Sequence, residues 1–351
     1  MSSGDSEGED VRRRELLLRG PGAGLAVIAD SSPAGSAAGP AAGQPVTARP
    51  AVGMTDVETV RAMTNTFRQL DSEFGGGHSR SQANTYLTAI VEPMVHNGRY
   101  TDTVKVELFS ATADLHQVIG WMAYDTGQAS IGRSHLRDGL RLCQEVENDA
   151  LAAEMLAGMS YQAGFAGAAE GAVDLALAAQ QAAKMRAIGP LLSRAATMEA
   201  YGLALQGDKT GCMAALRKAE QEFARRGYDV PPSLTHFDYA YLASMFAFAF
   251  RELRLPEEAE RFARRSLEMA DGNERGRLIR TAVLVGSLAD QGRVDEACAM
   301  AEHAVDMAGT IRSTRIVVYL SDVARRLAPF RAAVEVRGLY ERMADAGIPV
   351  G

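Results

Sequence analysis

The chain has 351 residues, of which 47% are hydrophobic and only 6% aromatic, and its formal net charge is -7. This charge argues against a nucleic-acid-binding protein that works through a basic surface. No apolar run reaches the roughly 20 residues of a membrane-spanning helix, so we expect no membrane span. Cys143, Cys212 and Cys298 are widely separated, which predicts buried free thiols in a cytoplasmic protein rather than a disulfide framework.

Residues 1–53 are rich in Gly, Ala, Ser and Pro. A segment of this composition has few apolar side chains to bury, so we expect a disordered tail or linker. Arg12–Arg14 followed by leucines allows a second interpretation, a weak export signal of the twin-arginine type. Arg19 and Pro21 interrupt that pattern, which favours the linker.

Residues 54–351 are expected to form one helical domain. Thr55 and Glu58 predict a capping box at its first helix, which Gly75–Gly77 would end. No later stretch alternates with the period of two that a half-buried strand requires, so the fold class is all-α. The remaining predicted helices cover residues 79–97, 101–125, 129–145, 148–164, 168–185, 190–206, 209–226, 234–252, 256–270, 274–291, 294–308, 313–328 and 330–346.

A repeat runs through this domain. Trp121, Tyr161 and Tyr201 each precede a glycine by the same number of residues, at Gly127, Gly167 and Gly207. Small residues recur after each turn at intervals of 40, 40, 47 and 38, where two helices must approach closely. These small residues are Gly132, Ala172, Cys212, Ala259 and Ala297. Helix pairs with small crossing residues are typical of tetratricopeptide repeats, so we predict a tetratricopeptide-like solenoid of helical hairpins.

Three segments, "GWMAYDTGQ", "MSYQAGFAG" and "ALQGDKTGCMAALRKAEQEF", resemble the repeat region of actinobacterial regulators that carry a Cro/repressor-type helix-turn-helix. The resemblance runs from about Met54 to Ala346. It implies a role in the control of transcription, in development or secondary metabolism. The chain departs from that family at its start, because residues 1–10 leave no room for the DNA-binding head. Direct DNA binding is therefore not expected, and either Met1 is the natural start or the head has been lost.

The aromatic column is the strongest candidate for a binding surface. In the repeat frame one position of the first helix faces the concave groove, and an aromatic ring there offers rigid apolar area. The alternative is that these rings only pack between neighbouring repeats. The aromatic candidates are Trp121, Tyr161, Tyr201 and Phe248, and the polar candidates near the same faces are Gln117, Gln162, Glu154, Arg194 and Arg251.

The sequence contains no catalytic or metal-binding pattern that we can identify. The six histidines are scattered, and neither a zinc-type pair nor a phosphate-binding loop is present. We therefore expect no enzyme, no metal and no cofactor. The predicted function is a non-enzymatic regulatory protein that binds a peptide, a small signal molecule or a partner protein in its groove. The alternative is a passive protein-interaction scaffold without a small ligand, and self-association into a homodimer is left open.

Overall fold

The computed structural model describes residues 49–186, 188–225, 237–268, 274–309, 311 and 313–350. The segment with Arg12–Arg14 and the loop around Pro231 and Pro232 lie outside the described residues. Residues 50–52 pair with the loop before α5, since the Val52 amide donates to the Arg99 carbonyl and the Arg99 amide donates to the Pro50 carbonyl, both at 2.9 Å. The folded domain thus includes residues that precede the expected boundary at residue 54.

The described residues are helical nearly throughout, which confirms the all-α fold class. The first part comprises α2 (Met54–Phe74), α3 (Arg80–Tyr86), a π-helical turn (Leu87–Val91), α4 (Glu92–Asn97), α5 (Asp102–Asp125) and α6 (Ala129–Glu145). The middle comprises α7 (Asp149–Phe165), α8 (Ala169–Arg186), α9 (Gly189–Leu205), α10 (Lys209–Ala224), α11 (Tyr239–Glu252) and α12 (Pro256–Glu268). The last part comprises α13 (Glu274–Asp290), α14 (Val294–Ala308), α15 (Thr314–Leu327), a 3-10 turn (Ala328–Phe330) and α16 (Val334–Asp345).

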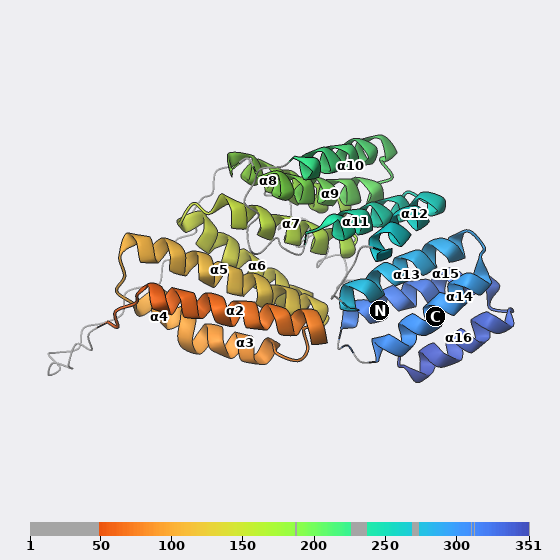
Figure 1. The fold of residues 1–351 in the computed structure, drawn as a ribbon, viewed down its shortest axis with the longest axis horizontal. Helices are drawn as coiled ribbons and strands as arrows, with labels where there is room; N and C mark the ends of the chain where they lie inside the picture. Colours follow the sequence, from red (N-terminus) through yellow and green to blue (C-terminus); the bar gives the residue numbers. More distant parts are fainter. Residues whose placement is uncertain are drawn as a thin grey trace, which may run out of the picture.

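Successive helices pair into hairpins, and the hairpins stack side by side (Figure 1). The first helices of the pairs, α5, α7, α9, α11 and α13, contact one another in order and form an inner layer that α15 continues. The second helices, α6, α8, α10, α12 and α14, lie outside them. This arrangement is the predicted helical-hairpin solenoid.

The hairpin turns follow the predicted register. Gly127, Gly167, Gly207 and Gly292 all have positive φ angles, between 72° and 80°, in the left-handed region where only glycine avoids a steric cost. In the turn between α11 and α12 that place is taken by Arg254, with φ 56°. The same backbone turn therefore recurs even where glycine is missing.

The small crossing residues also lie where the repeat requires them. A Cβ atom on Gly132 of α6 would lie 2.7 Å from the Gly120 carbonyl oxygen of α5, so no larger residue fits without a shift of backbone. In the next hairpin the Ser160 hydroxyl donates to the Ala172 carbonyl at 2.6 Å. Small side chains let the two helices come this close and hydrogen-bond across the crossing.

The predicted cap of the first helix is wrong in its residues. Helix α2 begins at Met54 with Gly53 as the N-cap, and the Asp56 carboxylate accepts a hydrogen bond from the Gly53 amide at 2.8 Å. The helix therefore starts earlier than a cap at Thr55 would allow. Aspartate at the third helical position satisfies a free amide and complements the helix dipole, as Glu58 was expected to do.

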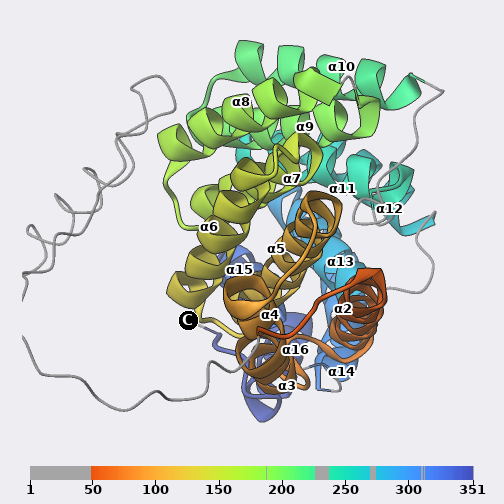
Figure 2. The ribbon, with the colours of Figure 1, turned by 90° about the vertical axis from the view of Figure 1, so that its left-hand side faces the viewer.

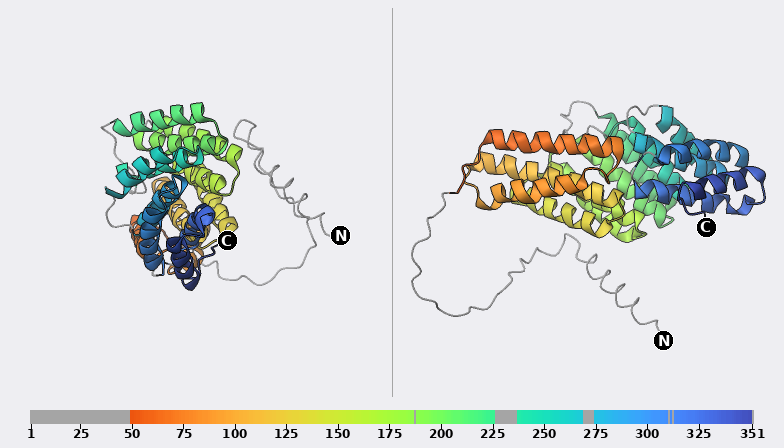
Figure 3. Two further views of the ribbon diagram at one scale, coloured as in Figure 1. Left: turned by 90° about the vertical axis from the view of Figure 1, so that its right-hand side faces the viewer. Right: turned by 90° about the horizontal axis from the view of Figure 1, so that it is seen from below.

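The inner layer curls until its two ends meet. Helix α2 packs beside α13, and Figure 2 shows the first and last hairpins lying together below the middle ones. The view from the opposite end agrees (Figure 3). The Arg275 guanidinium joins the ends, since it donates to both Asp71 oxygens at 2.8 and 3.0 Å and to Asp125 at 3.3 Å. We call Asp71, Asp125, Arg275 and Arg315 the closure cluster.

Candidate functional site

The four predicted aromatics form a continuous stack along the inner layer. Ring centroids are 5.7 Å apart for Trp121 and Tyr161, 6.4 Å for Tyr161 and Tyr201, and 6.3 Å for Tyr201 and Phe248. Such separations are within the range of favourable aromatic pairs. The rings therefore contact one another across neighbouring repeats.

The stack is not an open groove. Tyr319 of α15 covers it, with its hydroxyl 2.9 Å from the Tyr161 hydroxyl and its ring 5.5 Å from Phe248. Tyr161, Tyr201 and Phe248 are all buried. The rings lie closer together than the roughly 10 Å that separates the axes of neighbouring helices, because the side chains lean toward one another. An extended peptide laid across all four rings is excluded in this conformation.

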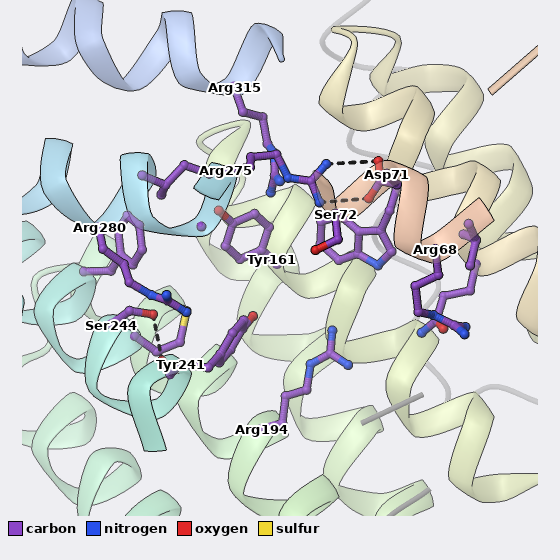
Figure 4. Close-up of a pocket in the computed structure, with 17 residues that line it drawn as sticks. Arg68, Asp71, Ser72, Tyr161, Arg194, Tyr241, Ser244, Arg275, Arg280 and Arg315 are labelled. Atoms are coloured by element: carbon purple, nitrogen blue, oxygen red, sulfur yellow. Dashed lines mark hydrogen bonds and ion pairs between the residues drawn. The ribbon is translucent and has the colours of Figure 1, made fainter. Parts of the chain in front are cut away.

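A cavity of about 240 Å³, partly open to solvent, lies beside one end of the stack and between the two ends of the solenoid (Figure 4). The helices that contribute to it are α2, α5, α7, α9, α11, α13 and α15. Its apolar wall is made by Val118, Trp121, Tyr161, Tyr241, Met245, Phe248 and Ile279. Its polar wall is made by Arg68, Asp71, Ser72, Gln117, Arg194, Ser244, Arg275, Arg280 and Arg315, with Gly276 between them.

The cavity gathers five of the nine residues expected from the sequence and leaves four outside. Those in its lining are Trp121, Tyr161, Phe248, Gln117 and Arg194. The four outside have other surroundings. Tyr201 packs between Tyr161 and Phe248, and Gln162 is buried with both amide atoms unpartnered. Glu154 lies behind the wall, where it accepts a hydrogen bond from Gln117 at 3.3 Å, and Arg251 pairs with Glu252 and Asp322.

Three of the arginines in the lining already have carboxylate partners. Arg68 donates to Asp114 at 2.6 Å, Arg275 is held by Asp71 and Asp125, and Arg315 donates to Asp125 at 2.8 Å. Burial alone would raise the pKa of the Asp125 carboxyl, but the charges of Arg315 and Arg275 hold it below its usual value. The charges of these three arginines are therefore neutralised, and the pairs of Arg275 and Arg315 also join the two ends of the solenoid.

Arg194 and Arg280 are different. The Arg194 side chain is only 3% exposed, and its Nη1 lies 3.8 Å from Glu154, too far for a hydrogen bond. Its Nε and Nη1 atoms have no hydrogen-bond partner. Arg280 is 8% exposed and makes neither an ion pair nor a hydrogen bond with any described residue. Desolvation lowers the pKa of the Arg280 guanidinium, and electrostatic interactions with Asp238 and Tyr241 offset this lowering only in part.

The repeat pattern could have predicted a further residue of the cavity lining. Two helical turns before each ring of the stack is a position that points to the same face, because seven residues make nearly two turns. Those positions hold Asp114, Glu154, Arg194 and Tyr241, of which Arg194 and Tyr241 line the cavity. Arg275, Arg280 and Arg315 carry no such signal, since they reach the cavity only because the solenoid curls back on itself.

Within the described ranges no group of three or more His, Cys, Asp or Glu side chains could hold a metal ion. Burial raises the pKa of the Cys143 and Cys212 thiols to about 12, which disfavours the reactive thiolate. As far as the structure describes the chain, each helix is too short or too polar to cross a bilayer.

No protein-family model matches this chain, and no curated protein matches its sequence. Solved structures with a similar course include the apo form of the quorum sensor NprR from B. thuringiensis, with a TM-score of 0.46 and 11% identity over 84% of this chain and 82% of that one. Another is Rap protein complexed with competence and sporulation factor, with a TM-score of 0.47 and 11% identity over 83% of this chain and 98% of that one. Both similarities are too remote to carry an assignment of function.

Proposed function

We propose that this chain is a cytoplasmic, non-enzymatic receptor that binds a small molecule, or the end of a short peptide, in the cavity between its two ends. The observation that carries the proposal is a cavity lined by aromatic rings and five arginines, one of which, Arg280, makes neither an ion pair nor a hydrogen bond with any described residue. Buried polar groups are nearly always satisfied, so unused donors beside an empty space call for a partner. Pockets with an apolar wall and a few converging polar groups are typical ligand sites.

The size of the cavity limits the ligand. An engineered cavity of about 150 Å³ holds benzene, so 240 Å³ suits a somewhat larger molecule or one or two residues of a peptide. A whole helix, about 10 Å or more in diameter, does not fit. Among the partners expected from the sequence, the cavity thus favours a small signal molecule or a peptide end over a partner's helix.

The position of the cavity supports a regulatory role. Its walls come from α2 and α5 at one end of the solenoid and from α13 and α15 at the other. A ligand that contacts both ends binds the closed arrangement of the solenoid more tightly than the open one. Its binding therefore shifts the equilibrium toward the closed arrangement. The closed and open forms would present different outer surfaces to a partner protein. Through such a partner we propose a role in the control of transcription, as the family resemblance implies, without direct DNA contact.

Thermal unfolding tests the proposal. A protein-free cell extract and a pool of short peptides are added separately, and the Tm is measured for the wild type and for Ser244→Phe, which fills the cavity. Ser134→Phe, an exposed serine of α6, is the matched control. We expect one addition to raise the Tm of the wild type and of the control but not of Ser244→Phe. A passive scaffold predicts no rise with either addition, or an equal rise in all three proteins.

A further inference from the structure

We propose that the ligand is a small organic monoanion with a flat apolar body, whose carboxylate binds Arg280 and Arg194 and whose body lies against Trp121. This inference rests on the proposed function and specifies the chemistry of the same site. Three independent observations support it: the charge balance of the cavity, the unused donors in it and the shape of its apolar wall.

The charge balance leaves one positive charge in excess. Five arginines line the cavity: Arg68, Arg194, Arg275, Arg280 and Arg315. Four carboxylates of the described residues lie within ion-pair distance of them: Asp71, Asp114, Asp125 and Glu154. The arginine left over is Arg280, which forms no ion pair with a described residue and feels only the longer-range charge of Asp238. A buried cation without a counter-ion is unfavourable, so a ligand with a single negative charge would neutralise the cavity.

The unused donors lie on the same wall as this charge. Arg194 on α9 and Arg280 on α13 both flank Tyr241, whose pKa is raised by burial and lowered in part by the charges of both arginines. Figure 4 shows both guanidinium groups directed toward the middle of the cavity from different helices. Guanidinium groups bind a carboxylate through paired N–H donors, so two of them can bind both of its oxygens.

The apolar wall matches a flat body. Trp121 is only partly buried and lies edge to face with Tyr124, with Tyr161 beside it. Phe248 and Met245 of α11 complete the wall. A planar ring packs against such surfaces with little loss of conformational freedom. Two sources supply this chemistry: a free aromatic acid, and the C-terminal carboxylate of a peptide that ends in an aromatic residue.

Titration of the Trp121 fluorescence tests the inference, because Trp121 is the only tryptophan and lines the cavity. The probes are phenylacetate and its neutral isostere phenylacetamide, followed by Gly-Gly-Phe with a free or an amidated C-terminus. We expect each acid to bind about tenfold to a hundredfold more tightly than its amide, the range for a charge-assisted hydrogen bond. Tighter binding of the tripeptide acid identifies a peptide end as the source, and tighter binding of phenylacetate identifies a free acid.

Arg280→Gln is expected to abolish this preference for the acid, whereas Arg280→Lys keeps part of it. Arg277→Gln, on the same helix but exposed, is the matched control and should bind like the wild type. Without ligand, Arg280→Gln should unfold at the same or a higher urea concentration than the wild type, because it removes a buried unpaired charge. A purely structural role for Arg280 predicts the opposite shift.

Equal binding of acid and amide by the wild type overturns the inference, as does the absence of binding by all four probes at millimolar concentration. Neither result contradicts the proposed function, which is tested separately by the thermal unfolding experiment with Ser244→Phe. Conversely, a preference for acids that survives in Ser244→Phe places the anion elsewhere and overturns this inference as well.

Discussion

The contact between Arg275 and Asp71 should be worth much more than a surface ion pair, and this can be measured with a double-mutant cycle. The two side chains are 12% and 11% exposed, and both Asp71 oxygens accept hydrogen bonds. Removing one partner of a buried pair typically costs about 3–5 kcal/mol, because the other charge is left buried and unpaired. We expect Arg275→Met and Asp71→Asn each to destabilise the protein at the lower end of that range, since Asp125 and solvent relieve part of the loss.

The coupling free energy is the sharper quantity. It is obtained from the urea unfolding of the wild type, the two single variants and the double variant. Arg342 and Asp306 provide the matched control, because they form the same kind of pair at the same 2.8 Å but are 47% and 57% exposed. The exposed pair should couple by about 0–1 kcal/mol. The Arg275–Asp71 pair should couple by about 2–3 kcal/mol, the upper range for residues in one network.

Two probes distinguish closure from global folding. Circular dichroism reports the helices, and Trp121 fluorescence reports the closure, because the Arg315 guanidinium lies 5.8 Å from the Trp121 ring. If the closure cluster holds the two ends together, Arg275→Met should shift the fluorescence transition to lower urea concentration than the transition in helix content. A coupling no larger than that of the exposed pair, with coincident transitions, would refute this account of the closure.

Two further predictions concern the close helix crossings of the repeat and the dependence of the protein's stability on pH. Gly132→Ala should destabilise by about 1–3 kcal/mol, because the new Cβ lies 2.7 Å from the Gly120 carbonyl oxygen. Gly338→Ala, at a helical glycine with open space around it, should instead stabilise by up to about 1 kcal/mol in the same urea unfolding measurement. Burial, with the charge of neighbouring His135, lowers the pKa of His116 from near 6.5 to about 3. The unfolded chain therefore binds this proton first as the pH falls, so stability should drop between pH 6.5 and 3, by about 2 kcal/mol at pH 5. His116→Gln should flatten that dependence, and a pH profile equal to that of the wild type would contradict it.

The sequence predicts the hairpins well because their requirements are local. A turn between two packed helices needs a residue with a left-handed backbone conformation, and a close crossing needs small side chains. Both requirements are therefore visible in the sequence of each repeat. Arg254 shows the limit of this reasoning, because only the register of its neighbours places a turn there. The cap at Gly53 was missed because several polar residues near the start of α2 compete for that role.

The closure could not be predicted in the same way. Asp71 and Arg275 are 204 residues apart, and they meet only if each of the intervening hairpins adds the right small rotation. A repeat pattern fixes which face of a helix points inward, but it does not fix the curvature. This explains why Arg194 and Gln117 were expected on the inner face, while Arg280 and Arg315 were not.

The aromatic rings recur at equal spacing along the sequence and so form the stack. The two ends of the stack have different surroundings. In the fifth hairpin the ring position is Gly286, and a Cβ there would lie 3.2 Å from the Arg326 side chain. The Arg251 guanidinium, 5.6 Å from the Phe248 ring, closes the stack at this end together with Asp322, which pairs with both arginines. At the other end Trp121 is left partly uncovered beside the cavity.

The rings themselves vary little, whereas the positions two turns before them change from Asp114 and Glu154 to Arg194 and Tyr241. A repeat that keeps its packing position and varies the position seven residues before it can change its ligand without losing its fold. The ligand selectivity of the proposed receptor should therefore depend on the residues at that varied position and on the arginines that the closure brings to face them.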